Sequence, residues 1–270
     1  MSLDLSPLPT LPREFCISPE TLVEKLAETH RSLENQDAIL AFDADGTLWS
    51  GDVGNDLFLA LIAGGAIRNA AHDALVKEAL DFGIAPGANT TDLARALFDS
   101  HETGQYPEDR CFAMMAWAFA GMSLAEAREF SKEVVRESKL EERLHRFLDP
   151  VFQWAKRENV GIWVVSASPK WMVEIGVAMF GIPSENVIGM MPVIDNEIIL
   201  PKLDGLPVYG TNKPKVLQQA RPQSVLLGGF GDSSYDVPLL QLARLPVAIR
   251  PKPSLIRRLP EVPNVQIIGV

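Results

Sequence analysis

The chain has 270 residues, of which 47% are hydrophobic and 22% are charged, as in ordinary globular proteins with one large domain or two smaller ones. The formal net charge of −10 argues against a nucleic-acid partner or an anionic membrane surface, because phosphate polymers are bound by clustered Lys and Arg. The two cysteines, Cys16 and Cys111, lie far apart, which argues against a disulfide framework and indicates a reducing compartment.

The amino-terminal residues carry prolines and acids where a secretory signal would have a basic region and an apolar run. No apolar stretch approaches the roughly 20 residues that a membrane span requires. We therefore expect a cytoplasmic protein that acts on a small molecule. The sequence leaves its oligomeric state open.

The first predicted element is a helix that begins at Ser18 and ends before Asn35. Serine suits the residue that caps a helix, Pro19 suits the first turn, and leucines then recur near helical spacing. The apolar run 38–42 follows and stops at acids and glycine. Such a short run is typical of a strand that is buried on both faces of a parallel sheet.

Residues 51–149 contain no convincing strand and several helical patterns. Helices are predicted over 55–63, 66–82, 91–100 and 108–120, and the pattern Ser123-Leu-Ala-Glu126 predicts the start of another. About a hundred helical residues between two strands are too many for an ordinary loop. We therefore predict an inserted helical domain over residues 51–149.

Apolar runs return in the last part of the chain. They predict strands over 160–165, 224–230, 246–249 and 265–268, together with a hairpin over 193–200 that turns at Asp195-Asn196. Helical patterns lie between several of these runs, which indicates an α/β fold. We predict that residues 1–50 and 150–270 form a Rossmann-like core with a parallel sheet.

The sequence Asp43-Ala-Asp45-Gly46-Thr47 comes directly after the first predicted strand. In extended backbone the two aspartates project to the same side, and the carboxyl end of a parallel strand is where open α/β sheets bind ligands. Gly46 allows the main chain to approach a ligand, and Thr47 offers a hydroxyl and an N–H to phosphate oxygens. An acidic turn is the structural alternative for this pattern.

Two further segments follow predicted strands or precede helices. Ser166 and Ala167 come before Ser168-Pro169, where a helix is expected to begin, and its N–H groups and the Ser166 hydroxyl could meet an anion there. A helix-capping serine is the simpler interpretation. Lys213 is a second candidate for phosphate, although a lone lysine is usually solvated.

The sequence Gly231-Asp232-Ser-Ser-Tyr-Asp236 places two more carboxylates after the third strand. If Asp232 and Asp236 converge with Asp43 and Asp45, the four groups raise one another's pKa values, and a hard cation relieves the repulsion. Oxygen ligands with room for water and a phosphate fit Mg²⁺ better than zinc, for which His and Cys clusters are absent from the sequence. We therefore expect magnesium as the cofactor.

In this order, the four motifs resemble those of the haloacid dehalogenase superfamily. The resemblance implies that Asp43 is the nucleophile and Asp45 the general acid and base. It also implies that Asp43, the Asp45 carbonyl and Asp232 bind Mg²⁺, with Asp236 nearby or acting through water. Ser166 and Lys213 would hold the phosphoryl oxygens.

The helical insert and the hairpin before Lys213 look most like those of the phosphoserine phosphatase group. In those enzymes an acidic residue that matches Asp52 faces the amino group of the substrate, although a solvated loop acid is an equal interpretation. They also carry an arginine for the substrate carboxylate where this chain has Met115, a departure that puts phosphoserine itself in doubt.

Three kinds of function follow. The first is a magnesium-dependent phosphomonoesterase that forms an aspartyl-phosphate and has a small phosphate ester as its partner. Phosphocholine or phosphoethanolamine is the alternative substrate, if Trp49 or Trp117 contacts the cationic group, although core packing is the simpler role for both rings. A phosphotransferase or mutase is the second kind, and a non-catalytic binding protein is the third.

Overall fold

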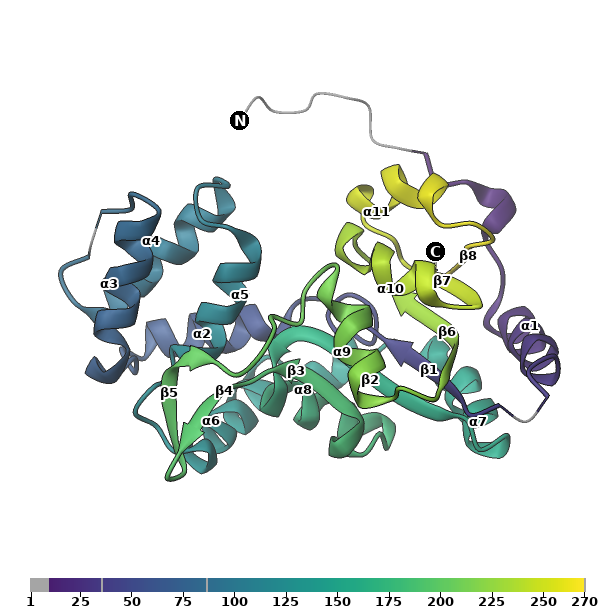
Figure 1. The fold of residues 1–270 in the computed structure, drawn as a ribbon, viewed down its shortest axis with the longest axis horizontal. Coiled ribbons are helices and arrows are strands. Elements are labelled where there is room, and N and C mark those ends of the chain that lie inside the picture. Colours follow the sequence, from purple (N-terminus) through teal and green to yellow (C-terminus); the bar gives the residue numbers. More distant parts are fainter. Residues whose placement is uncertain (1–9, 35, 86, 270) are drawn as a thin grey trace.

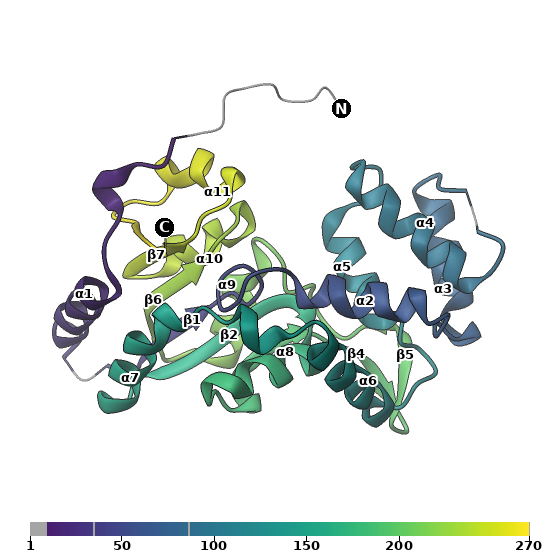
Figure 2. The ribbon, with the colours of Figure 1, turned by 180° about the vertical axis from the view of Figure 1, so that it is seen from behind.

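The computed structural model describes residues 10–269 apart from Asn35 and Pro86. A six-stranded parallel sheet lies at one end of the molecule, with helices on both faces, and a lobe of helices lies beside it (Figures 1 and 2). The strand order is β3-β2-β1-β6-β7-β8. The strands are β1 (Ala38–Phe42), β2 (Gly161–Pro169), β3 (Val187–Met190), β6 (Val225–Gly231), β7 (Leu245–Ile249) and β8 (Gln266–Ile268). The predicted α/β fold is confirmed.

The central strand β1 is buried on both faces, which explains its uninterrupted apolar sequence. Leu40 and Phe42 join the larger core with residues of α1 (Pro19–Arg31), α7 (Asp149–Arg157) and α8 (Lys170–Val177). Ile39 and Ala41 face a second core with residues of α9 (Asn212–Ala220) and α10 (Val237–Leu242). The sheet is therefore the middle of three layers, and α11 (Pro253–Arg258) follows β7.

The first helix begins as predicted. The Ser18 hydroxyl accepts a hydrogen bond of 3.2 Å from the N–H of Thr21, and Pro19 occupies the first turn. Asn35 lies outside the described residues, but the helix ends at Arg31, before it.

The lobe contains the helices of the insert. They are α2 (Val53–Ala63), α3 (His72–Asp81), α4 (Thr90–Glu102) and α5 (Glu108–Trp117), and α6 (Leu124–Glu137) follows beneath them in Figure 1. The capping box predicted at Ser123 is present, since Ser123 and Glu126 exchange both hydrogen bonds. The helix predicted over 66–82 is a short 3₁₀ turn at 69–71 followed by α3. The exact division of the chain at residues 50/51 and 149/150 stays a prediction.

A hairpin of β4 (Pro192–Asp195) and β5 (Ile198–Leu203) extends from the sheet to the insert (Figure 1). It turns at Asn196 and Glu197, which both have positive φ angles, one residue later than predicted. The N–H of Gly121 donates to the Ile199 carbonyl, and the N–H of Ile199 donates to the Met122 carbonyl, both at 2.9 Å. The hairpin is therefore bonded to the insert through its backbone.

Two other expectations concern the whole chain. Among the described residues, no helix combines the length and the apolar character needed to cross a lipid bilayer. Cys16 and Cys111 are both free thiols. The cytoplasmic location stays a prediction.

Candidate active site

The carboxyl ends of β1, β2 and β6 open into a cavity of about 290 Å³. Residues from the sheet, the insert and the loop after β7 line it. They are Asp43, Asp45, Asp52, Asn55, Phe98, His101, Glu102, Glu108, Phe112, Ser166, Ala167, Ser168, Tyr209, Lys213, Asp232, Ser233, Tyr235, Lys252 and Ser254. Seven of the sequence-predicted site residues are in this set, whereas Gly46, Thr47 and Asp236 are not among the lining residues.

Asp43 stands at the end of β1, where its N–H continues the sheet by donating to the Phe230 carbonyl at 2.9 Å. Its carboxylate accepts a hydrogen bond of 2.6 Å from Lys213 Nζ. The same ammonium donates to Asp236 Oδ1, also at 2.6 Å. Lys213 is only 3% exposed, so its charge is directed at these two acids rather than at solvent.

Asp45 is held by three donors. Its Oδ1 accepts from Trp49 Nε1 at 2.8 Å and from the N–H of Val53 at 2.7 Å. Its Oδ2 accepts from Ser168 Oγ at 2.6 Å. Three fixed donors leave the carboxyl group little freedom, so its orientation in the cavity is fixed.

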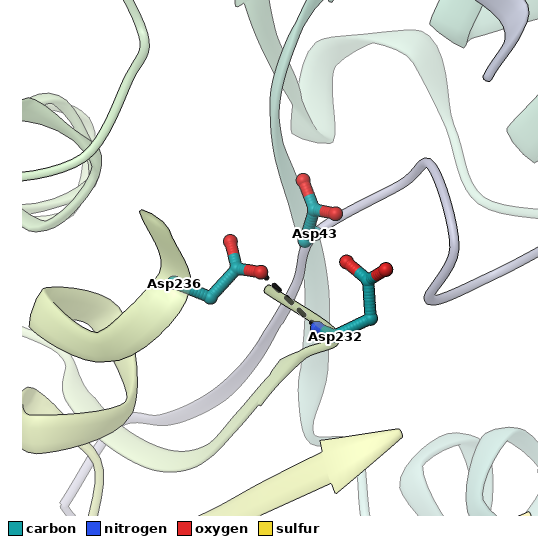
Figure 3. A group of neighbouring side chains, drawn as sticks. All are labelled: Asp43, Asp232 and Asp236. Carbon is teal, nitrogen blue, oxygen red and sulfur yellow. Dashed lines mark hydrogen bonds between the residues drawn. The ribbon is translucent and has the colours of Figure 1, made fainter. Parts of the chain in front are cut away.

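Asp232 follows β6 and faces Asp43, with Asp236 one turn later (Figure 3). One oxygen from each of Asp43, Asp232 and Asp236 lies within 4.8 Å of the other two. Asp236 is already engaged, because its Oδ2 accepts from the N–H groups of Asp232 and Ser233 at 3.1 and 3.0 Å, and its Oδ1 bonds Lys213. Asp43 and Asp232 are therefore the carboxylates that are better placed to bind a cation.

Burial dominates the electrostatics of this cluster. It raises the pKa of Asp43 to about 7 even though Lys213 favours the charged carboxylate. It also raises the pKa of Asp232 to about 7, with the Asp43 charge adding to the effect. Burial opposes the charge on Lys213, but Asp236 and Asp43 outweigh it and raise the lysine pKa.

Burial, together with the charge of Asp52, raises the pKa of Asp45 to about 7. A value near neutrality suits a group that both gives and takes a proton. The Ser168 hydrogen bond opposes this shift, because it stabilises the ionised carboxylate.

A hard divalent cation fits this donor set. The candidate ligands are carboxylate oxygens, and burial makes the ionised carboxylates unfavourable unless a cation is near them. The cavity also leaves room for water or a phosphate oxygen. These properties favour Mg²⁺ over zinc among the common metals of proteins. Asp43 and Asp232 would hold it, with Asp236 behind them.

Gly46 lets the chain pass close to Asp232. Its φ angle is +84°, and a Cβ atom at this position would lie 2.1 Å from Asp232 Oδ2. Thr47 is fully buried, its N–H donates to the Ala44 carbonyl at 3.1 Å, and its hydroxyl has no hydrogen-bond partner. The structure therefore gives Gly46 a spacing role and does not bring the Thr47 hydroxyl to the cavity.

Strand β2 continues through the segment where a helix was expected to begin. Ser166, Ala167 and Ser168 belong to the strand, and α8 starts only at Lys170. Ser166 lines the cavity and its Oγ accepts from the N–H of Ser168 at 3.1 Å. Its hydroxyl proton can therefore be donated to an anion in the cavity.

Asp52 lines the cavity and also caps α2, where its Oδ1 accepts from the N–H of Asn55 at 2.8 Å. Met115, Trp49 and Trp117 are buried and lie outside the cavity lining. Trp49 instead positions Asp45. Neither tryptophan is placed to contact a substrate in this cavity.

Sequence reasoning missed two polar groups and a set of rings. Ser168 binds Asp45, and Lys252 Nζ lies 2.8 Å from Asp232 Oδ2. Lys252 lies three residues after the end of a parallel strand, β7, and that position was the signal that could have identified it. The rings of Phe98, Phe112, Tyr209 and Tyr235 come from the insert and from loops, where no motif marks them.

Residues 40–241 match the family model described as haloacid dehalogenase-like hydrolase. The chain belongs to this family. The order of the motifs along this hydrolase agrees with the geometry above, in which the ends of β1, β2 and β6 meet at one cavity.

Solved structures support the fold. A protein of unknown function from Bordetella pertussis Tohama I is 20% identical, with a TM-score of 0.67 over 87% of this chain and 99% of that chain. A functionally unknown protein from Anaerococcus prevotii DSM 20548 is 13% identical, with a TM-score of 0.65 over 89% of this chain and 88% of that chain.

A substrate-bound phosphoserine phosphatase complex is 11% identical, with a TM-score of 0.51 over 87% of this chain and 92% of that chain. At these identities the likeness shows a shared fold. A search of curated proteins gave no match.

Proposed function

We propose that this hydrolase is a magnesium-dependent phosphomonoesterase that cleaves a small phosphate ester through an aspartyl-phosphate on Asp43. One observation carries the proposal: Asp43 lies in a cavity between a buried lysine, a second aspartate held by three donors, and Asp232. The fold that it shares with a phosphoserine phosphatase adds support.

In the first step, a carboxylate oxygen of Asp43 attacks phosphorus and the ester P–O bond breaks. Asp45 gives its proton to the leaving alcohol oxygen, so the products are the aspartyl-phosphate and the free alcohol. In the second step, Asp45 takes a proton from water, whose oxygen attacks phosphorus. Inorganic phosphate leaves and the Asp43 carboxylate is restored.

Charge is the main obstacle to this reaction, because an anionic carboxylate must approach an anionic phosphate. Bound Mg²⁺, held by Asp43 and Asp232, would supply Lewis-acid stabilisation of the phosphoryl oxygens. Lys213 contributes a fixed positive charge 2.6 Å from Asp43. Ser166 can donate a hydrogen bond to a phosphoryl oxygen from the end of β2.

The experiment follows hydrolysis of p-nitrophenyl phosphate with Mg²⁺ and with a chelator. We expect turnover that requires the metal, and the variant Asp43→Asn should lose it by at least about 10³-fold while circular dichroism shows an unchanged fold. Rapid acid quenching followed by mass spectrometry should find phosphate on the peptide that contains Asp43. Substantial turnover by Asp43→Asn would remove this residue as the nucleophile.

Product analysis distinguishes the related activities. Release of inorganic phosphate equal to the alcohol released is expected for a phosphatase. Transfer to an added sugar without release of phosphate would instead identify a phosphotransferase or mutase. Absence of metal-dependent turnover with every ester would favour a binding protein.

A further inference from the structure

Aromatic rings form a continuous row along the cavity, from the insert (Phe98, His101 and Phe112) to the segments that precede α9 and follow β6 (Tyr209 and Tyr235). The ring centroid of His101 in α4 lies 6.4 Å from that of Phe98 and 5.9 Å from that of Phe112. The row continues from Phe112 to Tyr209 at 5.7 Å and from Tyr209 to Tyr235 at 4.6 Å. All five side chains line the cavity.

Carboxylates accompany these rings. Glu102 ends α4 and Glu108 begins α5, and both line the cavity. Glu108 accepts a hydrogen bond of 2.8 Å from the Tyr209 hydroxyl, which joins the insert to the loop before α9. The carboxylate is thus held by the Tyr209 hydroxyl, and Phe112 lies one helical turn further along α5.

The charge balance of the cavity favours a cation. Six carboxylates and two lysines line it, and both lysines are bound to acids, Lys213 to Asp43 and Lys252 to Asp232. Bound Mg²⁺ and a phosphate dianion would cancel each other. The alcohol part of the ester would instead meet Glu102 and Glu108, and among the described residues that line the cavity no arginine offsets these two carboxylates.

We propose that Phe112, Tyr209, Tyr235, Glu102 and Glu108 form a subsite for a positively charged leaving group, so the substrates are phosphate esters of alkylammonium alcohols. This inference rests on the proposed phosphatase function and specifies its substrate class. Aromatic faces attract ammonium groups, and a nearby carboxylate strengthens the preference.

The subsite also disfavours a substrate that carries a carboxylate beside its amine. Phosphoserine would bring an anion to a wall that already holds Glu102 and Glu108, and Met115 lies buried outside the cavity. Like charges at close range oppose binding. Phosphoserine should therefore be a poorer substrate than ethanolamine phosphate.

The test compares choline phosphate with 3,3-dimethylbutyl phosphate, a neutral ester of nearly the same shape, in the presence of Mg²⁺. We expect kcat/KM for choline phosphate to be higher by at least about 10-fold, a ratio that corresponds to about 1.4 kcal/mol. Ethanolamine phosphate shows whether a primary ammonium is accepted as well as a quaternary one, and phosphoserine tests the effect of the carboxylate.

Two variants assign the preference to the subsite. Phe112→Leu keeps an apolar side chain but removes the ring, and Glu108→Gln removes the charge. Each should lower the ratio of choline phosphate to dimethylbutyl phosphate by at least about 3-fold. Glu129→Gln is the matched control, because this glutamate is on the exposed surface of α6, paired with Lys132, and should leave the ratio unchanged.

The outcomes separate the two proposals. A wild-type ratio near one, with both esters and p-nitrophenyl phosphate hydrolysed, would overturn the cationic subsite but leave the phosphatase function intact. Ratios in both variants equal to that of the wild type would also overturn it. If no ester is hydrolysed, the phosphatase function fails, and calorimetric binding of choline phosphate against its neutral analogue then decides on the subsite.

Discussion

Two parts of the cavity are built in different ways: the floor, formed by the acids at the ends of the strands, and the wall, formed by the row of aromatic rings with Glu102 and Glu108. On the floor, Asp43, Asp45 and Asp232 stand at strand ends, and each is bound to a lysine or to fixed hydrogen-bond donors. On the wall, aromatic rings pack against one another at tilted angles, and the Tyr209 hydroxyl donates a hydrogen bond to Glu108. The floor is suited to holding charges at fixed positions, whereas the wall is suited to selecting the shape and charge of an alcohol.

Because of this contrast, we expect substitutions in the two parts of the cavity to have different effects on activity. Changes to the floor should reduce the turnover of every phosphate ester, because the phosphoryl group is common to all of them. Changes to the wall should alter the choice among esters.

Lys213→Met should have the largest effect. It leaves Asp43 and Asp236 buried side by side without their shared cation, which should destabilise the fold by about 3–5 kcal/mol. Turnover of cationic and neutral esters should fall equally, by at least about 10³-fold. Urea unfolding and initial rates measure the two effects.

The matched control is Lys215→Met, because Lys215 lies on the same helix with its side chain exposed. It should resemble the wild type in stability and turnover. If Lys213→Met were no less stable than this control, the buried ammonium would not be needed to hold the two acids.

Gly46→Ala should displace Asp232. The new methyl group would need the space of Asp232 Oδ2, so we expect the Mg²⁺ concentration for half-maximal activity to rise at least about 10-fold. Gly205→Ala is a close control, since Gly205 has a φ angle of +81° and nothing within 4 Å of its added Cβ. An equal metal requirement in the two variants would show that backbone strain, not contact with Asp232, causes the change.

Ser168→Ala should have a smaller effect, on the acid rather than the nucleophile. Loss of its hydrogen bond destabilises the ionised form of Asp45 and raises the pKa of that carboxyl above its value of about 7. The alkaline limb of the kcat/KM profile should then move to higher pH, and kcat should fall by roughly 10-fold for alkyl esters.

The p-nitrophenyl ester should lose less activity in Ser168→Ala, because its leaving group needs little protonation. Ser131→Ala removes a buried serine that bonds the Ala127 carbonyl in α6 and serves as the control. An unchanged pH profile in Ser168→Ala would argue against Asp45 as the proton donor.

Metal removal should abolish turnover, and its effect on stability should be the smallest of these changes. The raised pKa values of Asp43, Asp45 and Asp232 mean that, without metal, the folded protein binds more protons than the unfolded chain between about pH 4 and pH 7. Stability in a chelator should therefore fall as the pH rises through that window. Mg²⁺ should restore the stability, and each kcal/mol gained in the free energy of unfolding should raise Tm by about 2–4 °C.

Thermal unfolding at pH 5 and pH 8, with and without Mg²⁺, measures this difference. The stabilisation by Mg²⁺ should be larger at pH 8, where the carboxylates are ionised. Equal stabilisation at both values would show that the metal does not bind to these groups.

The sequence predicted the floor well and the wall poorly, for a physical reason. Floor residues follow buried strands whose apolar runs are easy to recognise, and β1 has the bounds predicted for it. Wall residues acquire their neighbours only when the insert folds against the loops. Phe112 and Tyr235 are 123 positions apart in the chain, yet both belong to one row of rings.

The boundaries that differed have local causes. Strand β3 was not predicted, because it has four residues, one of them Gly189, and carries little signal. The helix predicted to reach Ala120 stops at Trp117, and the N–H of Gly121 bonds Ile199 of the hairpin instead. Periodicity along the sequence contains no information about such a distant partner.

The hairpin adds a third connection between the two halves of the molecule, besides the two places where the chain crosses. Because Gly121, Met122 and Leu124 exchange backbone hydrogen bonds with residues 197–199, a rotation of the helical lobe would carry the hairpin along or break all three bonds. A fragment limited to residues 51–149 would lack these partners. The unit that would rotate is thus the helical lobe together with the hairpin, because hydrogen bonds join them although they are far apart in the sequence. The segments on either side of the hairpin would then act as hinges.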